Sequence, residues 1–299
     1  MKKEESKPKQ YKKTRQKRFN DFLVTNRYTR KLLKIRYHSP NILKPSVSLG
    51  NESRALLEEF KENGIIKFPS LYIKECDFIL NEYLEPALRD DFSRKPFMVS
   101  TLNQRGLDMG KEVSVKLSMD IPELKRLFFD ENICGILYNF FQRQPYYRNQ
   151  PVLVQHTYRE TSKKDIQGKY HLDNGLDQVN FMLLLNDIDE NDTHMEYALK
   201  SVQEPVTIRD LNRFSFEDED IAEKYQILPL IGKKGTLYMF NAGNGYHRAL
   251  YKLNTTRKIL HWIVTPGHTL DGDQFERKEG WSHIKEKPAF VKSMIKKLL

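Results

Sequence analysis

The residues best suited to chemistry in this chain are two histidines, a carboxylate and an arginine. An H-x-D motif places His171 and Asp173 two positions apart, and His247 follows much later in the chain. Side chains on a strand alternate between its two faces, so His171 and Asp173 point the same way. Two histidines and one carboxylate on one side of a metal leave the opposite coordination positions open, which is the ligand set of non-haem Fe(II) oxygenases. The sequence therefore predicts a metal site formed by His171, Asp173 and His247.

The arginine extends this prediction from a metal to a cosubstrate. Arg257 lies in a strand-like segment shortly after His247, and alternation places it on the same face as Ile259. An arginine on an apolar face needs a polar or charged partner. Its planar guanidinium can hold a carboxylate, such as one of those of 2-oxoglutarate, through two parallel hydrogen bonds. We therefore expect Fe(II) as the cofactor, with 2-oxoglutarate and O₂ as cosubstrates.

A second H-x-acid motif competes with the first. His194 and Glu196 also precede His247, so spacing alone does not exclude them as ligands. The segment with His171 and Asp173 leads into an Asn-Gly pair, which is typical of a strand that ends in a turn. His194, in contrast, sits at the end of a polar run of loop type. We therefore expect the first motif to provide the ligands.

Two kinds of element would have to position these residues. Apolar periodicity predicts helices over residues 53–63, 74–88 and 122–138, with a short strand at 65–68 before the second helix. From residue 151 onward, short β-type runs recur between glycine and proline turn signals. These runs cover residues 152–158, 169–172, 178–185, a point near 207, 235–240, 247–253 and 258–265. The fold class is therefore expected to be mainly β with flanking helices, as a β-sandwich or jelly roll.

Charge is concentrated at the two ends of the chain. Lys and Arg number 50 against 40 Asp and Glu, for a formal charge of +10. We expect a basic N-terminal arm over residues 1–45, an oxygenase domain over 46–270 and a basic helical tail over 271–299. Such ends are either solvated or make peripheral contact with an anionic membrane.

The apolar runs are too short to cross a bilayer, and no apolar stretch follows the basic N-terminus as it would in a secretory signal. Cys76 and Cys134 match no zinc spacing, and two cysteines make no disulfide framework in a chain of 299 residues. We therefore expect reduced cysteines and a cytoplasmic protein, peripheral at most to the inner membrane face.

With these motifs in view, the sequence resembles the phytanoyl-CoA dioxygenase family of Fe(II)/2-oxoglutarate oxygenases. Residues 57–66 are similar to the family's opening helix-glycine-strand segment, and residues 183–197 to the strand and loop that follow its H-x-D motif. Residues 235–240 match the glycine-led strand before the distal histidine, and Arg257 matches the cosubstrate arginine. The resemblance implies a double-stranded β-helix (jelly-roll) core, with hydroxylation of a substrate coupled to decarboxylation of 2-oxoglutarate to succinate.

The chain departs from the family's pattern at two places. The family's Pro-Gly-Ser-His segment reads Ala-Leu-Lys-Ser at residues 198–201, and Ala249 stands where a small hydroxyl residue is common. The polar partner of the cosubstrate must then come from elsewhere, and Gln155, on the strand before the motif, is our candidate. A glutamine paired within the sheet explains Gln155 equally well.

The substrate is not specified by the metal-binding motif, because function depends on the pocket rather than the fold. A small molecule or a glycan is expected, and the basic ends favour a lipid-linked sugar, as for hydroxylases of the lipopolysaccharide sugar 3-deoxy-octulosonic acid. A nucleic-acid substrate is not expected, because the second arginine of AlkB-like oxygenases is missing. Two alternatives remain: a non-catalytic jelly-roll binding protein, and a metal cupin that uses no oxoacid.

Overall fold

The computed structural model describes residues 47–89, 98–99, 111–142, 145–148, 150–159, 168–173, 178–203 and 218–266. The predicted basic arm, the predicted helical tail and the strand expected near residue 207 lie outside these residues. Within the described ranges, no helix is long and apolar enough to cross a membrane.

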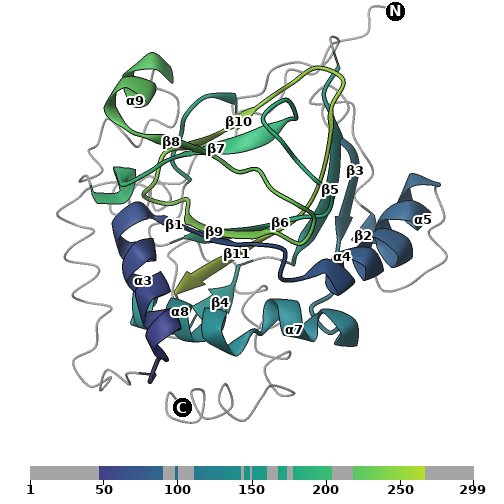
Figure 1. Cartoon of the computed structure of the whole chain (residues 1–299). Coiled ribbons are helices and arrows are strands. Elements are labelled where there is room, and N and C mark those ends of the chain that lie inside the picture. The colour runs from purple at the N-terminus through teal and green to yellow at the C-terminus, as the bar shows by residue number, and fades with distance from the viewer. Residues whose placement is uncertain are drawn as a thin grey trace, which may run out of the picture.

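Two antiparallel β-sheets form the centre of the molecule (Figure 1). The major sheet has the strand order β1-β9-β6-β11-β5-β3-β2, with β4 paired to β11. Its strands are β1 (Ile65–Phe68), β2 (Met98–Val99), β3 (Lys111–Lys116), β4 (Pro145–Tyr147), β5 (Val152–Thr157), β6 (Val179–Leu184), β9 (Leu237–Asn241) and β11 (Thr256–Pro266). The minor sheet has the order β10-β7-β8, with β7 (His194–Ala198), β8 (Ile227–Pro229) and β10 (His247–Leu250).

The major sheet is buried on both faces. On one face, Phe181 and Trp262 stack with their ring centroids 5.0 Å apart and pack against the helices. On the other face, Met182, Leu184 and Phe240 join the apolar interior between the two sheets. This arrangement explains why every residue of β6 is buried and why its sequence reads as an almost unbroken apolar run.

The helices cover the outer face of the major sheet, as Figure 1 shows below β1, β9 and β6. They are α3 (Asn51–Asn63), α4 (Ile73–Ile79), α5 (Glu85–Leu88), α7 (Lys125–Phe128) and α8 (Glu131–Phe141), with a π-helical turn at Leu80–Leu84 and a 3₁₀ turn at Pro122–Leu124. The helix α3 ends at Gly64, whose φ of 80° is the left-handed conformation that glycine adopts without a steric cost. A further helix, α9 (Asp218–Lys224), lies beside the minor sheet.

The predicted fold class, mainly β with flanking helices, is confirmed, although β2, β3, β4, β8 and α9 were not predicted. Three predicted segments also differ locally. The helix expected over 122–138 is divided in two, because the Asp130 carboxylate accepts hydrogen bonds from the backbone of Asn132 and Ile133 and starts α8 there. The polar run before His194 leads directly into β7, so this histidine is the first residue of a strand rather than part of a loop. The strand expected over 169–172 is reduced to a single bridge at His171.

Candidate metal centre

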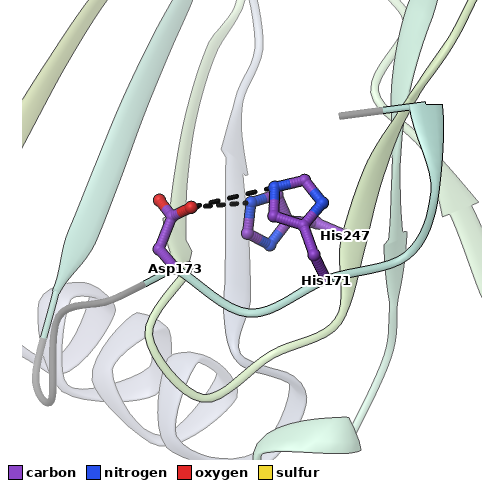
Figure 2. A group of neighbouring side chains, drawn as sticks. All are labelled: His171, Asp173 and His247. Atoms are coloured by element: carbon purple, nitrogen blue, oxygen red, sulfur yellow. Dashed lines mark ion pairs between the residues drawn. The ribbon is translucent and has the colours of Figure 1, made fainter. Parts of the chain in front are cut away.

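The three predicted ligands meet at one point between the sheets (Figure 2). Asp173 Oδ1 lies 3.8 Å from His171 Nε2 and 3.7 Å from His247 Nε2. One ligand atom from each residue lies within 4.8 Å of the other two. A single ion can therefore contact all three side chains, and two imidazoles with one carboxylate are the donor set expected of a non-haem Fe(II) site.

Backbone pairing brings the two histidines together. His171 N–H donates to His247 O at 3.0 Å, and His247 N–H donates back to His171 O at 3.2 Å. Asp173 N–H donates to Ala242 O at 2.8 Å, which fixes the carboxylate two residues further along the chain. The strand predicted over residues 169–172 is thus a single bridge, and that bridge joins the two candidate ligands His171 and His247.

Each imidazole is held by the nitrogen that faces away from the site. His171 Nδ1 lies 2.8 Å from Lys169 O, and His247 Nδ1 lies 3.0 Å from Gly245 O. A carbonyl oxygen only accepts, so each Nδ1 carries the hydrogen and donates it. The Nε2 of each ring is then directed at the site, as in protein metal centres where a second contact orients the imidazole ligand.

The carboxylate of Asp173 is oriented in the same way. Its Oδ2 accepts from Gln178 Nε2 at 2.6 Å and from Asn180 Nδ2 at 2.9 Å, which leaves Oδ1 for a metal. Arg148 Nη1 donates to Gln178 Oε1 at 2.6 Å and so orients the glutamine amide.

These surroundings also keep Asp173 ionised. Burial raises the pKa of Asp173, but the charges of His247 and His171, the hydrogen bond from Asn180 and the charge of His261 together lower that pKa below its ordinary value. An ionised carboxylate is the form that binds a cation. Asp173 is therefore ready to bind a metal without first losing a proton at neutral pH.

Gly245 allows His247 to approach the interior. A Cβ atom at this position would lie 1.8 Å from the hydroxyl oxygen of Tyr197, which is fully buried. Only glycine fits between this ring and the backbone of Asn241, two residues before the metal ligand. The Asn-Gly-Tyr-His sequence is thus explained locally by a close contact.

Arg257 faces the same interior from β11. Its side chain is 5% exposed, and Ile259 on the same face belongs to the apolar interior, as predicted. In the β5–β11 pairing, Arg257 stands opposite His156, whereas Gln155 stands opposite Lys258. Directly opposed residues share a face, so Gln155 lies on the outer, helix-facing side of the sheet and is not brought together with Arg257. His156, one residue later, is the β5 residue that stands opposite Arg257, and a cosubstrate contact of Gln155 stays a prediction.

The competing motif has a different role. Glu196 Oε2 accepts from Arg248 Nε at 2.6 Å and from the hydroxyl of Tyr170 at 2.9 Å. His194 is buried, with Nδ1 2.7 Å from Asp192 O, and it stands opposite Leu250 rather than His247 in the β7–β10 pairing. His194 and Glu196 are therefore structural residues of β7.

Sequence reasoning did not identify the polar residues around the ligands. Asn180 introduces an amide into a strand that is otherwise apolar and buried, Gln178 lies directly before that strand, and a buried polar side chain needs a defined partner. That signal was available in the sequence. Arg148, His156 and His261 could not have been found in this way, because only the strand register brings them to the interior.

Comparison with known proteins supports the fold. No protein-family model and no curated protein matches the chain. Among solved structures, the apoform of EctD from S. alaskensis has a TM-score of 0.52 at 15% identity, covering 75% of this chain and 82% of EctD. EctD with bound Fe has a TM-score of 0.50 at the same identity and coverage. The non-haem α-ketoglutarate-dependent epimerase SnoN has a TM-score of 0.48 at 12% identity, covering 75% of this chain and 88% of SnoN.

At these identities, the likeness to EctD shows the fold alone. The core of the chain is the jelly roll that was predicted. The resemblance to the phytanoyl-CoA dioxygenase family in particular stays a prediction.

Proposed function

We propose that this chain is an Fe(II)- and 2-oxoglutarate-dependent oxygenase. The single observation that carries the proposal is the way the ligand atoms are selected. In all three residues the second polar atom is engaged by the protein, and only His171 Nε2, His247 Nε2 and Asp173 Oδ1 are directed at a common point. EctD, which shares this fold, has been solved with bound Fe.

Different residues of the chain would bind the metal and the cosubstrate in such an enzyme. His171, His247 and Asp173 would hold Fe(II), and when bound the metal would supply the activation of O₂ that is coupled to oxidation of the oxoacid. Arg257 would bind the distal carboxylate of 2-oxoglutarate. Arg257 lies four positions, about 13 Å along β11, before His261, whose charge acts on Asp173. An arginine side chain can span part of this gap, and Ile259, Val154 and Met182 belong to the apolar cluster of the same interior.

We propose hydroxylation of an unactivated C–H bond of a small molecule or lipid-linked sugar as the reaction. The carboxylate at position 173 favours hydroxylation over halogenation, because halogenation needs a small residue there so that a halide can bind. Contact of the basic ends with an anionic membrane surface is part of the same proposal, since it would bring the site to a lipid-linked substrate.

The alternatives make different predictions for Arg257. A metal cupin that uses no oxoacid would keep its activity without this arginine, and a pure binding protein would not need three convergent ligand atoms. The Arg257→Met variant keeps much of the unbranched apolar stem of the side chain and removes the guanidinium with its charge. It therefore separates the 2-oxoglutarate enzyme from the oxoacid-independent cupin, and metal binding itself separates both from a pure binding protein.

The experiment is an anaerobic titration of Fe(II) with and without 2-oxoglutarate, in which the weak visible charge-transfer band of the chelate is measured. Wild type should develop the band only with both components. His171→Ala should lose it, and Arg257→Met should still bind Fe(II) but need at least tenfold more 2-oxoglutarate. A folded wild-type protein that gives no band would refute the proposal, and an Arg257→Met variant with unchanged 2-oxoglutarate affinity would favour the oxoacid-independent cupin.

A further inference from the structure

A second layer of side chains lies directly behind the metal ligands. Tyr170 and Leu172 alternate with His171 and Asp173, and Tyr246 precedes His247. These three neighbours are buried and form a small hydrophobic cluster of their own, separate from the interior between the sheets, with Ala198 of β7 and Ile221 of α9. Every ligand therefore has a chain neighbour whose side chain faces away from the metal and packs toward α9.

A partly buried ionic cluster lies next to this hydrophobic cluster. Arg248, the residue after His247, donates from Nε to Glu196 Oε2 at 2.6 Å and from Nη1 to Asp218 Oδ2 at 2.6 Å. Its guanidinium lies 4.6 Å from the centre of the Tyr170 ring. The hydroxyl of Tyr170 donates to Glu196, and the backbone N–H of Tyr170 donates to Asp218 Oδ1 at 3.3 Å. One arginine thus joins β7, β10, α9 and the H-x-D segment.

The cluster is more than a set of surface ion pairs. The side chains of Arg248 and Glu196 are only 18% and 14% exposed, so their interaction is screened less than that of a surface pair. Removal of one partner would leave the other charge partly buried and uncompensated. Because Tyr170 and Arg248 are covalent neighbours of two ligands, a shift in either one moves an imidazole.

The structure couples this cluster to one helix in particular. Asp218 is the first residue of α9, and Ile221 is its buried residue. Both contact the second layer, Asp218 through Arg248 and Tyr170, and Ile221 through the hydrophobic cluster. Figure 1 shows α9 next to β7, β8 and β10, on the side of the molecule away from the other helices.

We propose that α9 and the Arg248–Glu196–Asp218 cluster form a positioning element for the metal ligands, so that metal binding and the docking of α9 are energetically coupled. The inference rests on the proposed function, since it needs a metal at His171, Asp173 and His247. None of the cluster residues is among the three side chains whose ligand atoms converge. Loss of an outer contact that orients a ligand weakens metal binding about 10- to 100-fold. Coupling is reciprocal, so the metal must also stabilise α9.

The first test is Fe(II) affinity, measured anaerobically by calorimetry. Asp218→Asn is isosteric and removes a charge that is 34% exposed, so the variant should fold. Its affinity for Fe(II) should fall about tenfold, and that of Arg248→Met by at least as much. Asp187→Asn is the matched control, because Asp187 also pairs with one cation, Lys233 at 2.8 Å, and accepts from one backbone N–H, that of Lys234 at 2.8 Å. Its Fe(II) affinity should be unchanged.

The second test is hydrogen exchange of the α9 amides with and without Fe(II), a readout that a purely structural role would not change. Exchange in α9 should slow when wild type binds the metal, and this response should disappear in Arg248→Met. The positioning role is wrong if wild type binds Fe(II) and Asp218→Asn binds it with the same affinity. It is also wrong if wild type binds Fe(II) and the exchange rates of the α9 amides do not change. If wild type binds no Fe(II), the proposed function fails and this inference fails with it.

Discussion

The hydrogen bond from Asn180 to Asp173 provides the sharpest test of the metal centre. Asn180 is 5% exposed, and its Nδ2 donates to Asp173 Oδ2 at 2.9 Å. A hydrogen bond to a charged group contributes about 1.5–3 kcal/mol. The bond is present without metal, so part of this free energy stabilises the fold and the rest orients the carboxylate. Since 1.36 kcal/mol corresponds to a factor of ten, an Asn180→Leu variant should bind Fe(II) about tenfold more weakly.

The assay compares two leucine variants of similar volume change. Asn186 also lies in the major-sheet region, where its side chain accepts from Lys258 N–H at 2.7 Å and donates to Thr256 O at 3.3 Å, but it does not contact a ligand. Both Asn180→Leu and Asn186→Leu should lower the free energy of unfolding in urea, and only Asn180→Leu should weaken Fe(II) binding measured by calorimetry. Equal Fe(II) affinity in wild type and Asn180→Leu would show that Asp173 needs no orienting donor, and the reasoning would be refuted.

Three further predictions follow from the same geometry. Gly245→Ala should lower the free energy of unfolding by about 3 kcal/mol, because the new Cβ would overlap the buried hydroxyl of Tyr197, and thermal denaturation with a Fe(II) titration should show loss of both stability and metal binding. The lowered pKa of Asp173 means that the native state binds fewer protons than the unfolded state near pH 4, so its contribution to stability is full above the unfolded pKa and is lost as the pH falls through the folded pKa. Urea titrations of metal-free protein between pH 6 and 3 should therefore show a smaller acid-induced loss in Asp173→Asn than in wild type. Burial raises the pKa of Cys76 to about 12, so a thiol reagent at pH 8 should label Cys76 only after denaturation, and rapid labelling in the native protein would contradict its position in the core.

Two of the candidate metal ligands, His171 and Asp173, could be placed together from the sequence because their relation is local, whereas His247 reaches them through its backbone bridge to His171. Alternation along a strand places His171 and Asp173 on one side without any knowledge of the fold, and the same rule places Arg257 with Ile259. The helix boundary at Gly64 is local in the same sense. What alternation could not supply was the register between strands. The register decides that His156 rather than Gln155 stands opposite Arg257, and it depends on the packing of two complete sheets.

The β7 strand illustrates a different limit. Its first residue follows a polar turn, so the sequence around His194 favours a loop, and tertiary pairing with β10 overrides that preference. The same pairing places Glu196 opposite Arg248 and removes Glu196 from the set of possible ligands. A motif search alone therefore finds two H-x-acid motifs, and in the structure the pairing of Glu196 with Arg248 and the convergence of Asp173 with His171 and His247 distinguish them.

The alternation that identifies the ligands also explains how they are held. In Tyr170-His171-Leu172-Asp173, every second side chain is directed at the metal point and the others form the outer cluster; Tyr246 and Arg248 flank His247 in the same outward direction. A metal site on isolated loops would need separate supports for each ligand, whereas here the minor sheet and α9 pack behind the segments that carry the histidines, and Asn180 of the major sheet orients Asp173. Because the inner and outer residues share a backbone, the two faces cannot move independently. Substitutions on the outer face should therefore change metal affinity, although no outer side chain contacts the metal.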